Sequence, residues 1–186
     1  MKRIIDLLLW LLFFLLFAVP MLLIAVIVRL SSKGPSLYWS DRIGKNGKTF
    51  KMPKFRSMYI ETPLLATHLL HKPDSYITPI GGFLRRTSLD ELPQLFSILK
   101  GDMSFIGPRP ALYNQYDLIA LRKEKFVDRL IPGITGLAQV NGRDSLTISD
   151  KVMLDEEYLN CRSFLLDIKI FWLTFLKVVK RDDVSH

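Results

Sequence analysis

The chain of 186 residues is long enough for one domain of ordinary size and little more. Lysine and arginine outnumber aspartate and glutamate by 26 to 18, and the resulting net charge of +8 favours anionic partners such as nucleic acid, phospholipid head groups or phosphorylated substrates. Cys161 is the only cysteine in the sequence, which excludes an intrachain disulfide.

The N-terminal segment is suited to lipid. No charged residue occurs between Leu7 and Val28, which is long enough to span a bilayer as a helix, and Pro20 within it predicts a kink. A simple span usually has an excess of basic residues on one side only. Here both flanks are basic, with Lys2 and Arg3 before the segment and Arg29 and Lys33 after it. Two topologies remain open, namely a re-entrant helix that returns to the same face and a tilted, kinked span.

The next segments predict a small β element and several helices. Two strands, 38–40 and 49–52, flank an Asn-Gly pair that is a strong hairpin signal. Helices are expected over 92–100, 113–130 and 146–160, the first of them ended by Gly101. Between the last two, residues 131–143 read as turn-rich.

A last helix is predicted over Phe164–Val179. Asp167, Lys169 and Lys177 interrupt its apolar residues, so it should not span a bilayer. Apolar residues at helical spacing would let it lie in the membrane interface or pack against the core, and both interpretations stay open.

A pair of adjacent carboxylates, Asp90 and Glu91, follows Arg85. A purely structural explanation exists, because Ser88 and Glu91 have the spacing of a helix capping box. Pro93 disfavours that box and favours Asp90 as the cap, at the helix end that attracts anions. A carboxylate in that position can cap the helix, ligate Mg²⁺ or attack phosphorus.

An arginine lies between two prolines in Pro108-Arg109-Pro110. The prolines stiffen the backbone, which limits the entropy lost when the guanidinium of Arg109 grips phosphate or carboxylate oxygens. The alternative is a turn with a surface arginine or an ion pair with Asp102.

Further cations are interleaved with turn glycines along the chain. Lys54 and Arg56 form one cluster, Arg85 precedes the carboxylates, and Arg143 ends a glycine-rich loop. Each alone is more often a solvated charge. Together with Arg109 they predict one pocket for several phosphates, as a nucleotide diphosphate and a lipid phosphate would both require.

Four motifs resemble, in order along the chain, those of the bacterial sugar transferases, which are monotopic polyprenyl-phosphate phosphoglycosyl transferases. The motifs are Lys54–Met58, Ser88–Leu95, Lys100–Pro110 and Pro132–Arg143. The chain looks like the small form of this family. The resemblance implies a mostly α fold with a small β-hairpin element, built as a monotopic membrane protein with an N-terminal re-entrant helix over 1–33, interfacial amphipathic helices and a cytosolic-face catalytic domain over 34–186.

The family moves a sugar-1-phosphate from a UDP-sugar to polyprenyl phosphate, such as undecaprenyl phosphate, and releases UMP. This is the first membrane step of bacterial glycoconjugate synthesis. By resemblance, Asp90 would be the nucleophile that forms a covalent phosphosugar intermediate. Glu91 would assist as a base or by positioning the metal and the lipid phosphate, and Mg²⁺ would bind near both carboxylates.

The same resemblance places cations and the membrane segment. Lys54, Arg85 and Arg109 match phosphate-binding positions, and Arg143 would lie on the nucleotide or phosphate side. The family's N-terminal helix breaks at a proline, often as Ser-Pro, where this chain has Val19-Pro20. The expected location is the cytosolic face of the bacterial inner membrane, with membrane lipid, UDP-sugar and polyprenyl phosphate as partners and no nucleic acid.

Two rival functions would also account for part of the sequence. A non-catalytic basic adaptor anchored in the membrane would also explain the charge and the apolar segment, but it leaves Asp90, Glu91 and the enclosed Arg109 unexplained. A polytopic phosphoglycosyl transferase needs more apolar segments than this sequence contains.

Overall fold

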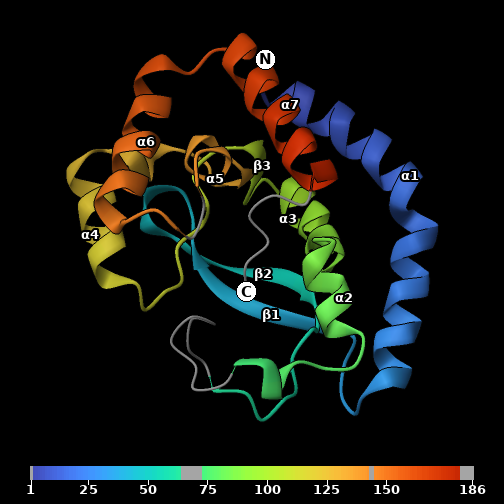
Figure 1. Ribbon diagram of the computed structural model, residues 1–186. Helices are drawn as coiled ribbons and strands as arrows, with labels where there is room; N and C mark the ends of the chain where they lie inside the picture. Colours follow the sequence, from blue (N-terminus) through green and yellow to red (C-terminus); the bar gives the residue numbers. More distant parts are fainter. Residues whose placement is uncertain (1, 64–72, 143–144, 181–186) are drawn as a thin grey trace.

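The computed structural model describes residues 2–63, 73–142 and 145–180. A long bent helix lies along one edge of the protein, and shorter helices lie on both sides of a central two-stranded ribbon (Figure 1). The α-helices are α1 (Lys2–Ser31), α2 (Gly81–Arg86), α3 (Leu95–Lys100), α4 (Tyr116–Glu124), α5 (Leu137–Val140), α6 (Ile148–Cys161) and α7 (Phe164–Lys180). The 3₁₀ helices are η1 (Lys45–Gly47), η3 (Pro73–Tyr76), η4 (Leu89–Gln94) and η5 (Val127–Arg129). The strands are β1 (Leu37–Ile43), β2 (Thr49–Phe55), β3 (Ser104–Ile106) and β4 (Gly133–Thr135). The prediction of a mostly helical fold with a small hairpin is confirmed.

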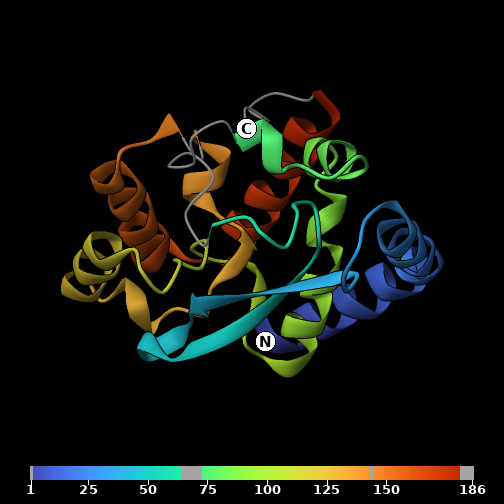
Figure 2. The ribbon, with the colours of Figure 1, turned by 90° about the horizontal axis from the view of Figure 1, so that it is seen from below.

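The hairpin forms where the sequence predicted it. Strands β1 and β2 pair antiparallel, and Asn46 and Gly47 in the turn have φ of 56° and 73°, as the Asn-Gly pair requires. The register places Tyr38 opposite Lys54 and Arg42 opposite Phe50. Side chains alternate along a strand, so Arg42 and Lys54 belong to the same face of the ribbon. Seen from below, the ribbon runs from α1 towards α4 (Figure 2).

A second, parallel pair of strands was not predicted. Residues 131–143 read as turns, but within them the structure has strand β4, which pairs with β3, and the short helix α5. Backbone approaches backbone at this pair, because a Cβ atom added to Gly133 would lie 2.1 Å from the amide nitrogen of Gly107. The glycines that signalled turns therefore allow close strand packing instead.

One side of α1 packs against the core. The ring of Phe13 lies 5.4 Å from that of Phe105 and 6.2 Å from that of Phe171, and Val28 near the other end of the helix is fully buried. The opposite side is apolar and exposed, as Leu15 at 69 % shows. Among the described residues, α1 is the one helix long and apolar enough to cross a membrane.

Helix α1 bends midway along its length, and Pro20 lies inside it (Figures 1 and 2). Proline removes a backbone hydrogen bond from the helix and clashes with the preceding turn, which explains the bend. The first turn of α1 lies beside α3 and α7, and its last turns lie beside the ribbon, where Ser36 Oγ donates to the carbonyl of Ala25 at 2.8 Å. Both ends of α1 thus contact the same body of protein.

Helix α7 has two apolar sides. Ile170 is fully buried, and Leu166 and Leu173 pack against the core. Leu165 and Trp172 are 76 % and 58 % exposed. The sequence left open whether this helix packs against the core or lies in the membrane interface. Core packing accounts for one side of it, and the other side exposes Leu165, Ile168 and Trp172.

Candidate active site

The two carboxylates lie in η4, which is followed directly by α3. Neither capping interpretation is correct. Ser88 has φ of 55° and makes no side-chain capping bond, while Asp90 lies inside the 3₁₀ helix and Gln94 occupies the N-cap position of α3. Pro93 fits because a 3₁₀ segment precedes the α-helix, which begins at Leu95 rather than near residue 92. The helix ends at Gly101 as predicted, with φ of 92°.

Glu91 brings three separate elements together. Its Oε1 lies 2.7 Å from Lys54 Nζ in β2 and 2.8 Å from Arg109 Nη2, in the segment after β3. The Lys54 and Glu91 side chains are 16 % and 12 % exposed. Partly buried charge-assisted bonds of this kind fix orientation, so Arg109 is no freely solvated turn residue.

Asp90 is 8 % exposed, and burial raises its pKa above the ordinary value of 3.8. Lys54 opposes that rise in pKa, Glu91 adds to it, and Arg85 and Arg109 oppose it. Burial likewise lowers the pKa of Lys54 below its ordinary value of 10.5, although Glu91 counteracts this. The site is therefore a coupled group of charges with little access to water.

Arg42 also belongs to this group, although it was not among the predicted site residues. Burial lowers its pKa to about 10, with a further lowering by Arg109 and an opposing effect of Glu91. Its guanidinium donates to Ser40 Oγ at 3.0 Å and to the carbonyl of Pro110 at 3.1 Å. The signal was the alternation of the hairpin, because Arg42 shares a ribbon face with Lys54 once the register is known.

An ion pair behind the site holds the backbone of Arg109, and it too was missed. Arg122 of α4 donates to the carbonyl of Arg109 at 2.7 Å and also pairs with Asp155 of α6 at 2.6 Å. Asp155 is 1 % exposed, and burial raises its pKa while Arg122 opposes the rise. The position of Arg109 is thus set by its side chain at Glu91 and by its carbonyl at Arg122.

Three of the five predicted cations lie around the carboxylates, namely Lys54, Arg85 and Arg109. Arg56 does not join them. It is 4 % exposed, and its guanidinium donates to carbonyls just after α1, including that of Lys33 and, at 2.9 Å, that of Ser32. Arg143 lies outside the described residues.

The carboxylate pair could bind Mg²⁺ if the substrate supplied the remaining ligands. This ion is usually held by one or two carboxylates together with phosphate oxygens and water. Asp90 and Glu91 are adjacent in η4, and their carboxylate oxygens are ligands of this kind. In the residues that the structure describes, no cluster of three or more His, Cys, Asp or Glu side chains could hold a metal by itself, so substrate oxygens would complete the coordination.

The arrangement is suited to chemistry on a phosphorylated substrate. Four cationic side chains interact electrostatically with the two carboxylates, namely those of Arg42, Lys54, Arg85 and Arg109. The excess positive charge would attract a phosphate group, and a buried aspartate next to it could act as a nucleophile that needs no deprotonation while it is ionised.

Comparison with known proteins supports this interpretation. Residues 1–181 match the sequence model of a family described as bacterial sugar transferase. An undecaprenyl-phosphate glucose phosphotransferase from Komagataeibacter xylinus is 41% identical over 196 residues, which cover 100% of this chain and 36% of the relative. A UDP-glucose:undecaprenyl-phosphate glucose-1-phosphate transferase from Escherichia coli (strain K12) is 40% identical, with 95% of this chain and 40% of the relative covered.

An undecaprenyl-phosphate galactose phosphotransferase from Salmonella typhimurium is 37% identical, with 80% of this chain and 34% of the relative covered. The chain therefore spans between a third and two fifths of the length of these three relatives, whose names all concern the transfer of a sugar phosphate to undecaprenyl phosphate. The family match extends over nearly the whole chain, including α1 and every residue of the site. This protein belongs to the bacterial sugar transferase family.

Proposed function

We propose that this protein transfers a sugar-1-phosphate from a UDP-sugar to polyprenyl phosphate and releases UMP, at the cytosolic face of the bacterial inner membrane. The observation that carries the proposal is the buried Asp90 beside Glu91, Lys54 and Arg109, in a chain of the bacterial sugar transferase family. Since relatives are named for glucose and galactose transfer to undecaprenyl phosphate, UDP-hexoses are the first donors to test.

In the first half-reaction, a carboxylate oxygen of Asp90 attacks the β-phosphorus of the UDP-sugar. The bond between that phosphorus and the bridging oxygen breaks, the oxygen leaves with UMP, and the sugar phosphate becomes an acyl phosphate on Asp90. The negative charge on the phosphoryl group is balanced by Lys54, Arg85 and Arg109. In the structure the positive charges of these residues already interact with the carboxylate of Asp90.

In the second half-reaction, a phosphate oxygen of polyprenyl phosphate attacks the same phosphorus. The bond to Asp90 breaks, the carboxylate is regenerated, and the product is a polyprenyl diphosphate sugar. Glu91 would help to orient the incoming lipid phosphate, because its Oε1 fixes both Lys54 and Arg109. When bound, Mg²⁺ would neutralise phosphate charge, and Asp90 and Glu91 are the residues that would hold it.

Insertion of α1 into one face of the membrane is part of the proposal. It is supported by polar contacts of both ends with one body of protein, since Lys2 Nζ lies 2.6 Å from Asp167 Oδ2, and Arg56 binds carbonyls just beyond the last turn of the helix. The exposed apolar sides of α1 and α7 would face lipid. A site held in this way could reach UDP-sugar from water and a lipid phosphate from the bilayer.

The test uses the full chain in lipid nanodiscs with undecaprenyl phosphate, Mg²⁺ and a panel of UDP-sugars, and it measures UMP release. Without the lipid acceptor, intact-mass analysis should find the chain heavier by one sugar phosphate. Asp90→Asn should lose this adduct and at least about 10³-fold of the turnover. Glu91→Gln should still form the adduct but turn over slowly.

Asp41→Asn is the matched control, because Asp41 is an exposed carboxylate of the same chain whose partner is Lys51 on the outside of the ribbon. It should keep both the adduct and the turnover. Undiminished UMP release by Asp90→Asn would show that the proposed mechanism is wrong.

A further inference from the structure

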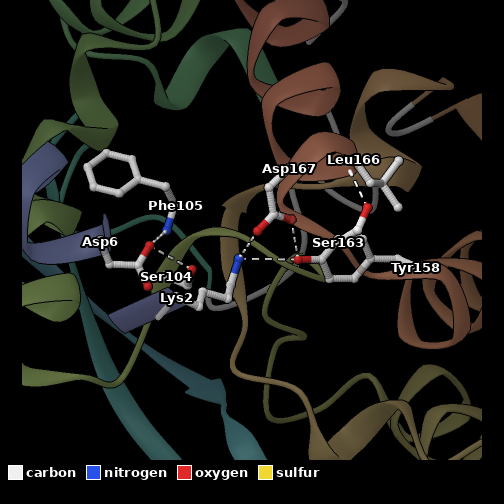
Figure 3. Close-up of polar contacts among 8 residues, drawn as sticks. All are labelled: Lys2, Asp6, Ser104, Phe105, Tyr158, Ser163, Leu166 and Asp167. Carbon is white, nitrogen blue, oxygen red and sulfur yellow. Dashed lines mark hydrogen bonds and ion pairs between the residues drawn. The ribbon is translucent and has the colours of Figure 1, made fainter. Parts of the chain in front are cut away.

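Three polar side chains in the first two turns of α1 reach into the rest of the protein. Lys2, Arg3 and Asp6 make these contacts and are together named the N-terminal clamp (Figure 3 shows Lys2 and Asp6). They precede the long apolar stretch of the helix, in which charged side chains are absent. The elements that each of them holds indicate what the clamp does.

Asp6 holds the start of β3. Its Oδ1 accepts hydrogen bonds from Ser104 Oγ at 2.9 Å and from the amide of Phe105 at 3.2 Å (Figure 3). Asp6 is 6 % exposed and Ser104 is fully buried. Burying a carboxylate without hydrogen bonds would destabilise the fold, so the two hydrogen bonds should hold Asp6 firmly against Ser104 and Phe105.

Strand β3 leads directly to the active site. It ends at Ile106, and Arg109 follows three positions later with its Nη2 2.8 Å from Glu91. Gly107, between them, is held by a backbone bond to Thr135 at 2.9 Å. Asp6 therefore fixes one end of a short, well-bonded segment whose other end carries Arg109.

Arg3 holds the end of α3. Its Nη1 donates to the carbonyl of Ile98 at 2.6 Å and its Nη2 to the carbonyl of Leu99 at 2.8 Å. These carbonyls belong to the last turn of α3, and that of Ile98 also accepts from the amide of Gly101, which caps the helix. Since α3 continues directly from η4, Arg3 holds the far end of the segment that carries Asp90 and Glu91.

We propose that Arg3 and Asp6 are positioning residues of the active site, which fix the carboxylate pair of Asp90 and Glu91 relative to Arg109 through α3 and β3. An anchor for α1 alone could use any surface of the domain. These two residues instead contact the two elements that run into the catalytic groups. Lys2 is different, because its contacts are to Tyr158 and Asp167 in α6 and α7. The catalytic readout of this inference rests on the proposed function.

The first test compares Arg3→Gln and Asp6→Ala with Arg29→Gln in nanodiscs. Arg29 is the matched control, because it also donates from α1 to a backbone carbonyl, that of Gly34 at 2.8 Å, but this carbonyl belongs to the turn after its own helix. Arg3→Gln and Asp6→Ala should lower kcat about 10- to 100-fold and change KM for the UDP-sugar by less than about threefold, because small misplacements act on the chemical step. Arg29→Gln should keep wild-type kcat.

Two further variants separate positioning from a loss of folding. Asp6→Asn retains an oxygen that can accept from Ser104 and Phe105, so it should keep most of kcat. In a double-mutant cycle, Asp6→Ala combined with Arg109→Lys should lower kcat by less than the product of the two single effects, because both act on the same guanidinium. Fully multiplicative effects, or losses that only follow the amount of folded protein, would overturn the inference.

Hydrogen exchange, which does not depend on catalysis, tests the positioning role separately from the proposed function. In Asp6→Ala, backbone hydrogen exchange should accelerate over 104–110, and in Arg3→Gln over 89–100, while the hairpin over 37–55 stays as in wild type. Unchanged exchange in 104–110 and 89–100 would refute the positioning role even if the enzyme is active. Accelerated exchange in a protein that turns over no UDP-sugar would leave the positioning of these segments in place and refute the proposed function.

Discussion

Burial raises the pKa of Asp90 and lowers the pKa of Lys54, and both shifts affect the proposed reaction. The nucleophile must be ionised, and the pKa of Asp90 is raised. The ammonium of Lys54 must be charged to neutralise phosphate, and its pKa is lowered. The pH range in which both groups carry the required charge is therefore narrower than for the same side chains in water.

A bell-shaped pH profile with both limbs moved towards neutrality follows for kcat/KM, which reports the free enzyme. Because the pKa of Asp90 is raised above its ordinary value of 3.8, the acid limb begins at a higher pH. Because the pKa of Lys54 is lowered below its ordinary value of 10.5, the alkaline limb begins at a lower pH. Lys54→Arg should shift the alkaline limb upwards, because arginine stays protonated, and should leave the acid limb in place. Rates of UMP release across the pH range test this, and an alkaline limb unchanged by Lys54→Arg would contradict it.

The individual residues differ in how far the sequence could reveal them. Asp90, Glu91 and Arg109 stand out because their neighbours in sequence are unusual, and the structure brings them together. Arg42 and Arg122 have ordinary neighbours. The role of Arg42 can be recognised only once the strand register is known. The role of Arg122 depends on the contact of a helix with a distant loop, which no local pattern encodes.

At the scale of elements, the hairpin and most helices follow local patterns, while the β3–β4 pair does not. Each of its strands has three residues, too few for alternation to be recognised, and each is defined by a partner far away in the chain. Helix α4 shows a milder difference, because the helix predicted over 113–130 is interrupted at Phe126, which has φ of 57°. Similarly, η4 escaped prediction because a 3₁₀ turn before a helix has no distinct apolar period.

Gly133→Ala tests the importance of the close strand pair. The new Cβ would lie 2.1 Å from the amide nitrogen of Gly107, and backbone atoms cannot move aside as a flexible side chain can. We expect a loss of about 2–3 kcal/mol of stability, which for a chain of this size is a fall in Tm of about 5–10 °C. Gly82→Ala is the control, because its Cβ would meet no atom closer than 3.8 Å and should leave Tm unchanged or slightly raised. Equal Tm values for the two variants would contradict the predicted strain.

At the scale of the whole molecule, α1 and α7 expose apolar surface that the core does not use. Trp172 and Phe175 stack on the outer side of α7 with ring centroids 5.7 Å apart, and they are 58 % and 53 % exposed. Tryptophan is favoured where the hydrocarbon meets the head groups. The two helices lie side by side near the N-terminus (Figure 1), so their outer sides could enter one leaflet together.

Trp172 should therefore contact lipid tails. A variant in which it is the only tryptophan, made by Trp10→Phe and Trp39→Phe, should show emission that is shifted to the blue and quenched by brominated lipids. Adding Tyr116→Trp to a tryptophan-free chain gives a control on α4, across the molecule from α1 (Figure 1), which should respond to iodide in water instead. The same quenching pattern for both probes would refute lipid contact by α7.

The attachment of α1 at both ends has a consequence for bilayers of unequal thickness. A free transmembrane helix adapts to a thicker or thinner hydrocarbon layer by changing its tilt. This helix cannot do so alone, because Arg3 ties it to α3 at one end and Arg56 ties it to the ribbon at the other. With α1 inserted into one face of the membrane as proposed, mismatch would be absorbed by stretched or compressed acyl chains or by tipping of the entire protein, and the fold would set the depth of the helix.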